Sequence, residues 1–236
     1  MNFPGPLFRG RLVQRYKRFL ADIILDSGET ITASCPNTGA MLGLSTPGLV
    51  VWVSHNTIPT RKYRYTLELV ETGSGETATL VGINTGLPNK IVGEALALGQ
   101  LAPFGGYDTI ASEQKYGVNS RIDFLLDDRV KGRCYVEVKN VHLLRTQGLA
   151  EFPDSVTARG AKHLDELADM VRQGHRSVML YLIQRADVAR FSLARDIDPA
   201  YHAAFVRARE AGVKTVACRC TITPQSITIA GLVEIL

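Results

Sequence analysis

The chain is poor in several features that define specialised classes of protein. It has four cysteines in 236 residues, too few for the disulfide framework of a small secreted domain. Hydrophobic residues make up 45% and charged residues 21% of the chain, proportions that exclude a disordered or collagen-like protein. The net charge is only +4, so overall charge alone does not identify a partner.

Long apolar runs are also absent. Pro or Arg interrupts every apolar stretch in the first twenty residues, which therefore predict no secretory leader. Residues 30–60 contain no Asp, Glu, Lys or Arg, but Pro and Gly repeatedly break this segment. A membrane-spanning helix needs about 20 mostly apolar residues. We therefore expect a soluble, cytoplasmic protein.

The cysteines do not have the spacing of a zinc site. Cys218 and Cys220 lie two residues apart in a Val/Thr/Ile-rich run, which predicts alternate faces of a strand, and no second pair exists. Cys35 lies in a segment of strong turn residues, 35–39, with no His nearby, so a structural loop is favoured over a nucleophile. We expect reduced, structural thiols.

The two parts of the sequence differ in pattern. Residues 1–85 contain short runs of branched residues separated by turn signals such as Thr72-Gly73-Ser74-Gly75, without a convincing helix. This pattern predicts a small β-barrel or sandwich. Strands are expected near 12–13, 21–25, 49–53, 63–70 and 78–83.

Residues 86–236 predict a mixed α/β domain. Helices are expected at 89–99, 155–173 and 198–212, because apolar residues recur at helical spacing and capping residues flank these segments. Strands are expected at 109–115, 120–126, 133–141, 178–184, 213–223 and 226–235. The order is α-β-β-β-α-β-α-β-β, and we place the domain boundary near residue 85.

Charged residues recur at fixed positions in two neighbouring predicted strands. Side chains alternate along a strand, so Glu137 and Lys139 share one face of 133–141. If the turn to the preceding strand centres near Val130, Asp123 lies opposite Glu137, with Cβ atoms about 5 Å apart. The pattern predicts two carboxylates and an ammonium group on one patch.

Such a patch suits metal-dependent chemistry on a phosphodiester. Mg²⁺ prefers carboxylate oxygens, water and phosphate oxygens, and it lowers the pKa of its bound water. Lys139 can orient the attacking hydroxide or stabilise charge on the phosphorane. A structural interpretation stays open, because an amphipathic edge strand with paired surface charges has the same alternation.

The order helix, three strands with Asp and then Glu-x-Lys, helix, strand resembles the core of the PD-(D/E)xK nuclease superfamily. This resemblance implies catalytic roles for Asp123, Glu137 and Lys139, with Asp123 and Glu137 holding metal. It also implies a further acidic ligand from the preceding elements. Glu113 and Glu94 are the candidates, and we prefer Glu113.

A second resemblance covers the whole chain. The motifs that carry it are Cys35-Pro36-Asn37-Thr38-Gly39-Ala40-Met41, Tyr116-Gly117, Ser120-Arg121-Ile122-Asp123, Glu137-Val138-Lys139-Asn140-Val141, Phe152-Pro153-Asp154, Thr157-Ala158-Arg159-Gly160-Ala161-Lys162-His163-Leu164 and Ile197-Asp198-Pro199. In this series the sequence is similar to the sugar fermentation stimulation protein (SfsA) family. The resemblance implies a two-domain α+β fold, an N-terminal OB-like β-barrel followed by a mixed α/β nuclease-like domain. It also implies non-specific DNA binding and a role in bacterial sugar metabolism.

Basic residues gather with aromatic ones in the N-terminal part. One cluster spans 9–18, in a stretch without acids that includes Tyr16 and Phe19, and a second spans 61–65. Lys and Arg contact phosphates and aromatic rings stack on bases, although either cluster alone also fits a solvated edge strand. Charged residues line one face of the helix after Asp154 as well. The candidate nucleic-acid-binding residues are Arg9, Arg11, Arg15, Lys17, Arg18, Arg61, Lys62, Arg64, Arg159 and Lys162.

Three functions remain under consideration. The leading hypothesis is a bacterial DNA-binding protein, without sequence preference, that carries a divalent-metal site. The alternative is an active Mg²⁺- or Mn²⁺-dependent nuclease that hydrolyses DNA or RNA. The third is a regulatory module whose core only binds DNA, which the retention of Asp, Glu and Lys together disfavours. His163 is not assigned to the metal, because a carboxylate site suits Mg²⁺. The sequence does not decide between a monomer and a homo-oligomer.

Overall fold

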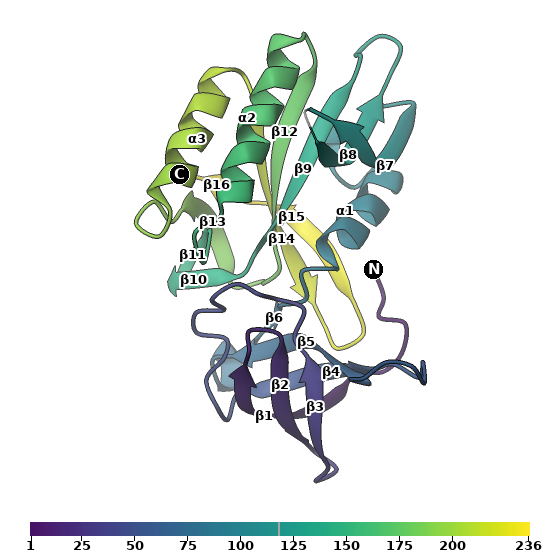
Figure 1. The fold of residues 1–236 in the computed structure, drawn as a ribbon, viewed down its shortest axis with the longest axis vertical. Coiled ribbons are helices and arrows are strands. Elements are labelled where there is room, and N and C mark those ends of the chain that lie inside the picture. Colours follow the sequence, from purple (N-terminus) through teal and green to yellow (C-terminus); the bar gives the residue numbers. More distant parts are fainter. Residues whose placement is uncertain (118) are drawn as a thin grey trace.

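The computed structural model describes residues 1–117 and 119–236, and its first strands close into a barrel (Figure 1). The strands run in the order β3-β2-β1-β4-β5-β6, and a parallel pairing of β3 with β5 closes the barrel. This is the strand order of an OB fold, as predicted. The elements are β1 (Phe8–Tyr16), β2 (Leu20–Leu25), β3 (Thr30–Ser34), β4 (Val50–His55), β5 (Tyr65–Thr72), a 3₁₀ turn (Gly75–Thr77) and β6 (Thr79–Gly82).

The strand that closes the barrel, β3, is the one barrel strand that was not expected from the sequence. Its five residues alternate a buried Ile31 and Ala33 with more exposed Thr and Ser side chains. This is ordinary strand alternation, but the segment is short and polar enough to resemble a turn region. Its β structure depends on β2 and β5, which pair with its two edges.

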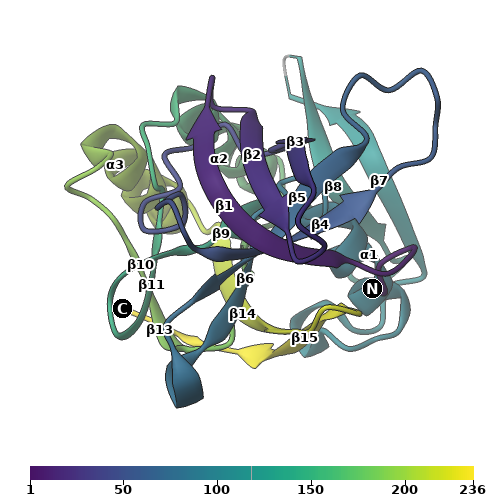
Figure 2. The same cartoon turned by 90° about the horizontal axis from the view of Figure 1, so that it is seen from below.

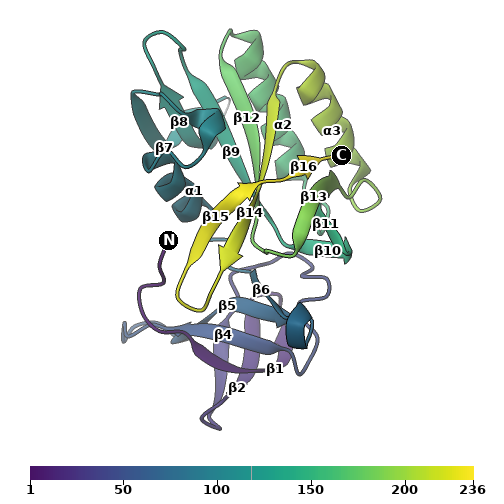
Figure 3. The ribbon, with the colours of Figure 1, turned by 180° about the vertical axis from the view of Figure 1, so that it is seen from behind.

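The second domain is built on a six-stranded central sheet with the order β15-β14-β12-β9-β8-β7. Helices α2 and α3 cover the face toward the viewer in Figure 1, and the β14–β15 hairpin is seen best from behind in Figure 3. The elements are α1 (Pro88–Ala97), a 3₁₀ turn (Ala102–Phe104), β7 (Thr109–Tyr116), β8 (Ser120–Asp127), β9 (Cys134–Val141), β10 (Leu143–Thr146), β11 (Gly148–Phe152), α2 (Ala158–Arg172), β12 (Arg176–Ile183), β13 (Val188–Leu193), α3 (Pro199–Glu210), β14 (Lys214–Ile222), β15 (Ile227–Leu232) and β16 (Glu234–Ile235).

Strand alternation divides the interior of this domain into two cores. Val136 and Val138 of β9 belong to the core that contains α1, whereas Tyr135 belongs to the core that contains α2 and α3. Glu137 has the same parity as Tyr135, so its side chain points from the middle of the sheet toward α2. A charged residue is thereby buried where an apolar one would ordinarily pack.

Several elements differ from those expected. β10, β11, β13 and β16 form a small separate sheet that was not predicted, since each strand is short and pairs mostly with distant segments. The predicted strand 226–235 is divided between β15 and β16, which belong to different sheets. Helix α2 begins at Ala158 rather than at residue 155, because the Thr157 side chain caps it by accepting from the Gly160 amide.

The two domains meet at close backbone contacts. The Gly82 amide donates to the Gln184 carbonyl at 2.9 Å, and a Cβ on Gly82 would lie 2.3 Å from Gln184 Oε1. The Met41 amide donates to Asp154 Oδ2 at 2.9 Å, and a Cβ on Gly39 would clash with the same carboxylate. Both glycines are therefore required by the approach of the neighbouring domain.

The domain ranges 1–85 and 86–236 stay a prediction. The last barrel strand ends at Gly82 and α1 begins at Pro88, while the first three residues leave the barrel. Asn2 forms a bridge with Ser226, and Phe3 packs in the core that contains α1.

Within the described ranges, no helix is long and apolar enough to cross a membrane. All four cysteines are free and buried.

Candidate metal centre and nucleic-acid interface

Asp123 and Glu137 face each other where β8 and β9 diverge. The ladder runs from Leu126–Cys134 to Phe124–Val136, and one further step places Asp123 opposite Glu137. There the backbone pairing stops, and Asp123 Oδ2 accepts the Val138 amide at 2.7 Å instead. The carboxylate thus takes the place of a missing strand partner and is held at the edge of β9.

The other oxygen of the Asp123 carboxylate, Oδ1, is held by a residue of α1. Asn89, in the first turn of that helix, donates from Nδ2 to Asp123 Oδ1 at 2.7 Å. With one hydrogen bond to each oxygen, the carboxylate has a defined orientation. Each oxygen still has lone-pair capacity for a further ligand.

Glu137 is almost completely buried, with 2% of its surface exposed. Its Oε1 accepts from Lys139 Nζ at 2.7 Å and contacts His163 Nδ1 of α2. Its Oε2 is also buried and has no hydrogen-bond partner among the described residues. Leaving a buried carboxylate oxygen unpaired is costly, so this atom is a marked exception to the usual satisfaction of buried polar groups.

The two carboxylates are perturbed in opposite directions. Burial raises the pKa of Asp123, and the nearby charge of Glu137 adds to the effect. Burial also opposes ionisation of Glu137, but the hydrogen bond from His163 and the charge of Lys139 outweigh it, so its pKa is lowered. Perturbation by desolvation together with a specific charged partner is typical of functional sites.

Glu113 reaches the same place from the middle of β7. The β7–β8 register is the same on both sides of it, from Ser112–Phe124 to Gln114–Ile122, so Glu113 lies opposite Asp123, and its φ is 55°. A non-glycine residue in this backbone region stores strain. Glu113 Oε1 lies 3.5 Å from Asn89 Nδ2, on the Asp123 side of the site.

Glu94, the other candidate for a fourth acid, lies elsewhere. Its Oε2 is 3.0 Å from the amino group of Met1, an ion pair between α1 and the N-terminus. The preference for Glu113 therefore agrees with the geometry. Its role as a metal ligand remains a prediction.

A cavity of about 540 Å³ opens over these groups. Basic side chains from β8 and α2 surround its acidic floor, an arrangement suited to a phosphate oxygen above a cation. Its lining residues are Glu113, Asn119, Ser120, Arg121, Asp123, Glu137, Arg159, Lys162 and His163. Arg159 and Lys162, predicted from one helix face, thus lie beside the predicted acids.

Part of the polar face of α2 packs against the sheet, which was not expected from the sequence. His163 follows Arg159 at helical spacing, and its ring lies between Glu137 and Arg159 Nε. Glu166, one turn further, is buried, and its Oε1 accepts from Ser120 Oγ at 2.8 Å. Helical spacing could have grouped His163 and Glu166 with Arg159, but spacing alone does not show which of these side chains face the sheet.

Two more buried polar atoms lack partners near this centre. They are Glu166 Oε2 and the Tyr116 hydroxyl, within the part of the chain that the structure describes. Burial raises the pKa of Tyr116, and the charges of Glu137 and Glu166 raise it further. The hydroxyl therefore stays protonated beside the acids and is available as a donor.

The predicted barrel cations fall into two groups. Arg15 is structural, because its guanidinium donates to the carbonyls of Asn37 at 2.8 Å and Gly39 at 2.9 Å and so holds the interdomain loop. Arg9 pairs with Asp26, and Arg11 donates to the Gly48 carbonyl. The remaining residues are exposed in the β1–β2 and β4–β5 connections. They are Lys17, Arg18, Arg61, Lys62 and Arg64.

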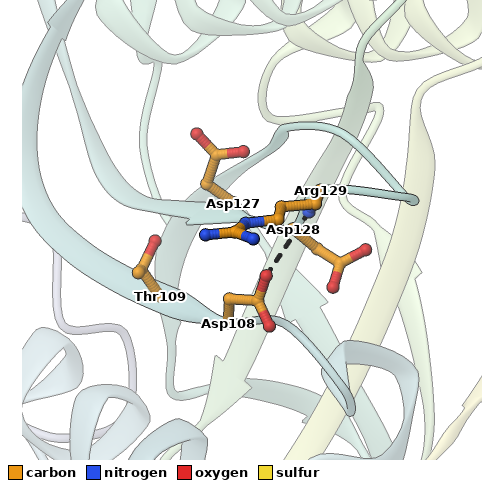
Figure 4. A pocket seen from close by; sticks show the side chains of 5 residues that line it. All are labelled: Asp108, Thr109, Asp127, Asp128 and Arg129. Atoms are coloured by element: carbon orange, nitrogen blue, oxygen red, sulfur yellow. Dashed lines mark hydrogen bonds between the residues drawn. The ribbon is translucent and has the colours of Figure 1, made fainter.

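A second acidic pocket lies at the other end of β8 (Figure 4). Asp108, Asp127 and Asp128 line it with Thr109 and Arg129, and the three carboxylates point in different directions. Hydrogen bonds from the Lys131 and Val130 amides lower the pKa of Asp128, as in an ordinary turn. This pocket therefore contains as many acids as a metal site could use, but none of its three carboxylates is buried.

No three His, Cys, Asp or Glu side chains within residues 1–117 and 119–236 converge closely enough to form a complete metal cage. Asp123 and Glu137 offer two carboxylates, with one oxygen of Glu137 unpartnered. Mg²⁺ commonly binds through one or two carboxylates and completes its shell with water and substrate phosphate. The donor set fits a cation of this kind.

Fold and site together define a class, a protein in which an OB barrel is joined to a mixed α/β domain with a buried carboxylate–lysine centre. The family model described as "SfsA N-terminal OB domain" matches residues 13–83. The model described as "Sugar fermentation stimulation protein RE domain" matches residues 86–226. The chain belongs to the sugar fermentation stimulation protein (SfsA) family, so the resemblance and the predicted fold class are confirmed.

Individual relatives match along nearly their whole lengths. The chain is 59% identical over 235 residues to a sugar fermentation stimulation protein homolog of Brucella ovis, covering 100% of this chain and 97% of that relative. The homolog of Brucella melitensis is 58% identical with the same coverage. A solved structure, of Pyrococcus furiosus SfsA in complex with Ca²⁺, superposes with a TM-score of 0.88 at 26% identity, covering 100% of this chain and 98% of that one.

Proposed function

We propose that this protein binds DNA without sequence preference and holds a divalent cation, Mg²⁺ or Mn²⁺, at Asp123 and Glu137. The observation that carries the proposal is the buried, unpartnered Oε2 of Glu137, opposite a second carboxylate whose pKa is raised. A cation would offset both the unpaired oxygen and the repulsion between the two acids. The Ca²⁺ in the structure of the Pyrococcus furiosus relative supports the choice of an oxygen-seeking cation.

The residues of the centre have separable roles in this proposal. The cation, when bound, supplies Lewis-acid activation of a phosphate oxygen and a more acidic water. His163 and Lys139 hold Oε1 of Glu137, which keeps Oε2 directed to the ligand. Glu113 is the proposed additional acid, and Arg159 and Lys162 bind phosphate at the rim of the cavity.

A second candidate function, phosphodiester hydrolysis, is favoured by Lys139. Its Nζ is largely buried beside Glu137, where it can hold an attacking water or stabilise charge developing on the phosphate. DNA binding alone has no need of a buried ammonium group next to two acids. In this form of the proposal the protein is a nuclease acting on DNA or RNA.

The description of the family model suggests a cellular role for the proposed DNA binding. The description names sugar fermentation, which supports a role in sugar metabolism, and the free, buried cysteines support action in the cytoplasm. A DNA-binding protein with this role would act on the genes of sugar utilisation.

The test measures cation binding and cleavage separately. Isothermal titration with Mn²⁺ and Mg²⁺ compares the wild type with Glu137→Gln, and with Glu76→Gln as the control, an exposed glutamate of the barrel. Single-stranded DNA, duplex DNA and RNA are then incubated with each protein and either cation or EDTA. We expect cation binding in the wild type and the control only. If Glu137→Gln binds the cation as tightly as the wild type, the proposed metal centre is wrong. If the substrates stay intact under all conditions, the nuclease function is wrong and only the DNA-binding function remains.

A further inference from the structure

Closure of the barrel brings together two connections that lie far apart in the sequence. The β1–β2 connection leads into Leu20, which pairs with Ser34 of β3. On the other edge of β3, Ala33 pairs with Tyr65, the residue that follows the β4–β5 connection. One strand therefore separates the two connections, and both lie on the side of the barrel toward α2 and β7 (Figure 2).

Both connections present cations to solvent. Lys17 and Arg18 are exposed in the first, and the second carries the exposed Arg61, Lys62 and Arg64. None of the five forms an ion pair with a residue that the structure describes, in contrast to Arg9, which pairs with Asp26. Their charge is therefore available to an anionic partner.

Aromatic rings lie at the root of the β4–β5 connection. The rings of Phe8, His55 and Tyr65 form a cluster. The ring centroids lie 6.3 Å apart for Phe8 and His55, 6.2 Å for Phe8 and Tyr65, and 4.9 Å for His55 and Tyr65. Tyr65 packs against the barrel core and is half-buried, whereas Phe8 remains 42% exposed and His55 is exposed. Phe19, in the other connection, is 50% exposed. Rings that served only to close the end of the core would be covered.

Exposed rings between unpaired cations suit one form of nucleic acid. Cations bind the backbone phosphates of single and double strands alike, but rings can stack only on bases that are not already stacked in a duplex. In OB folds, the β1–β2 and β4–β5 connections are the loops that bind oligonucleotides. We propose that these two connections bind an unpaired nucleic-acid strand, with bases stacked on the Phe8–His55–Tyr65 cluster and on Phe19.

The same strand would lead to the acidic centre, which links this inference to the proposed function on which it rests. Arg15, at the end of β1, holds the loop that contains Asn37 and Gly39. That loop is bound in turn to Asp154, three residues before the Thr157 cap of α2. The β1–β2 connection is thereby linked to the segment that leads into the first turn of α2, which carries Arg159. The substrate class of the centre is then a single strand, or a duplex end opened into single strands.

The experiment compares binding of a 5′-labelled single-stranded 20-mer with binding of the matching duplex, by fluorescence anisotropy in EDTA at several salt concentrations. We expect the single strand to bind more tightly. Phe8→Leu and Tyr65→Leu remove a ring and keep an apolar side chain, and each should weaken single-strand binding about fivefold or more while leaving duplex binding unchanged. Tyr65→Phe retains the ring and should restore binding. Leu232→Ala, an exposed apolar residue of β15, is the control and should have no effect.

Charge removal separates phosphate contacts from stacking. Arg64→Gln should weaken binding of both forms and reduce the slope of log affinity against log salt by about one. Melting curves of every variant confirm that it folds. Duplex binding at least as tight as single-strand binding, or ring variants that weaken both forms equally, would overturn the inference and leave DNA binding intact. Failure to bind either form would instead overturn the DNA binding of the proposed function.

Discussion

Strand β8 carries acidic residues in two opposite environments. In its middle, Asp123 is half-buried opposite the buried Glu137, and desolvation raises its pKa. At its end, Asp127 pairs with Arg133 in the open, and the pKa of the adjacent Asp128 is lowered by amide donors. The carboxylates at the end of the strand have partners and solvent, whereas the centre retains an unpartnered oxygen on Glu137.

The difference shows that a count of acids is a poor guide to function. The group at the end of β8 has three aspartates, one exposed and two half-buried, but its turn and solvent stabilise each negative charge without a ligand. The pair formed by the half-buried Asp123 and the buried Glu137 has fewer carboxylates, but it carries an electrostatic cost that a cation would relieve. Substitutions matched between the two regions therefore test whether burial, rather than acid content, makes the site.

The largest expected effect is on cleavage, where two lysines can be compared. Lys139→Ala should lower the rate of metal-dependent hydrolysis about 10²–10³-fold, because it removes a group aimed at developing charge. Lys131→Ala, which removes a lysine bonded to the Gly105 and Gly106 carbonyls near the exposed acids, should leave the rate unchanged. The measurement is the initial rate of nucleotide release with Mn²⁺. Equal losses in both variants would assign no special role to the buried lysine.

The next effect is on cation affinity. Asp123→Asn should weaken Mn²⁺ binding about tenfold or more, because a neutral amide replaces a charged ligand. Asp127→Asn, four residues along the same strand, should change the affinity by less than twofold. Isothermal titration measures both constants. If the two variants weaken binding alike, the cation is held by the general negative field of β8 and not by the buried centre.

A smaller effect is on stability, at a third aspartate. The hydrogen bond from His142 lowers the pKa of Asp154 to about 2 despite burial, so its charge stabilises the fold. This contribution is full above the unfolded-state pKa near 4 and is lost as the pH falls from about 4 to 2. Asp154→Asn should lower the free energy of unfolding by about 1–2 kcal/mol at pH 7 and flatten the acid side of the stability profile. Urea denaturation at pH 3 to 7 measures this, and a profile parallel to the wild type would contradict it.

The smallest effect is expected at the exposed turn. Asp128→Ala removes an acceptor for the Val130 and Lys131 amides but no buried charge. Its melting temperature should fall slightly, and cation affinity and cleavage should stay at wild-type values. Differential scanning calorimetry and the same titration give both readouts. A clear loss of cation affinity would mean that the pocket in Figure 4 contributes to metal binding.

How much of the centre was predictable depends on the range of the interactions involved. Asp123, Glu137 and Lys139 could be placed together because strand alternation and the length of one hairpin connection determine their positions. The start of α3 at Asp198 was also readable, since capping is a contact within a few residues, whereas the start of α2 was placed at residue 155, two residues before its Thr157 cap. The roles of His163 and Glu166 were not readable, because helical spacing gives a face but not what covers it.

The barrel shows the same limit. Arg15 has the sequence context of a phosphate-binding residue, but its guanidinium is used by carbonyls more than twenty positions away. β3 has little strand signal of its own and depends on two partners, one of them parallel and distant. In both cases the deciding contact is non-local, and no local pattern encodes it.

The sequence by itself therefore determined the family, the two kinds of domain and the three charged residues of β8 and β9, because motifs, periodicity and hairpin register are local properties. Only the tertiary structure decided which charges are buried. It turned His163 and Glu166 toward the sheet, left Glu137 Oε2 unpartnered and placed Glu113 in the cavity, opposite Asp123. These outcomes depend on the desolvation that packing against distant segments produces, and desolvation distinguishes the centre from the acids at the end of β8.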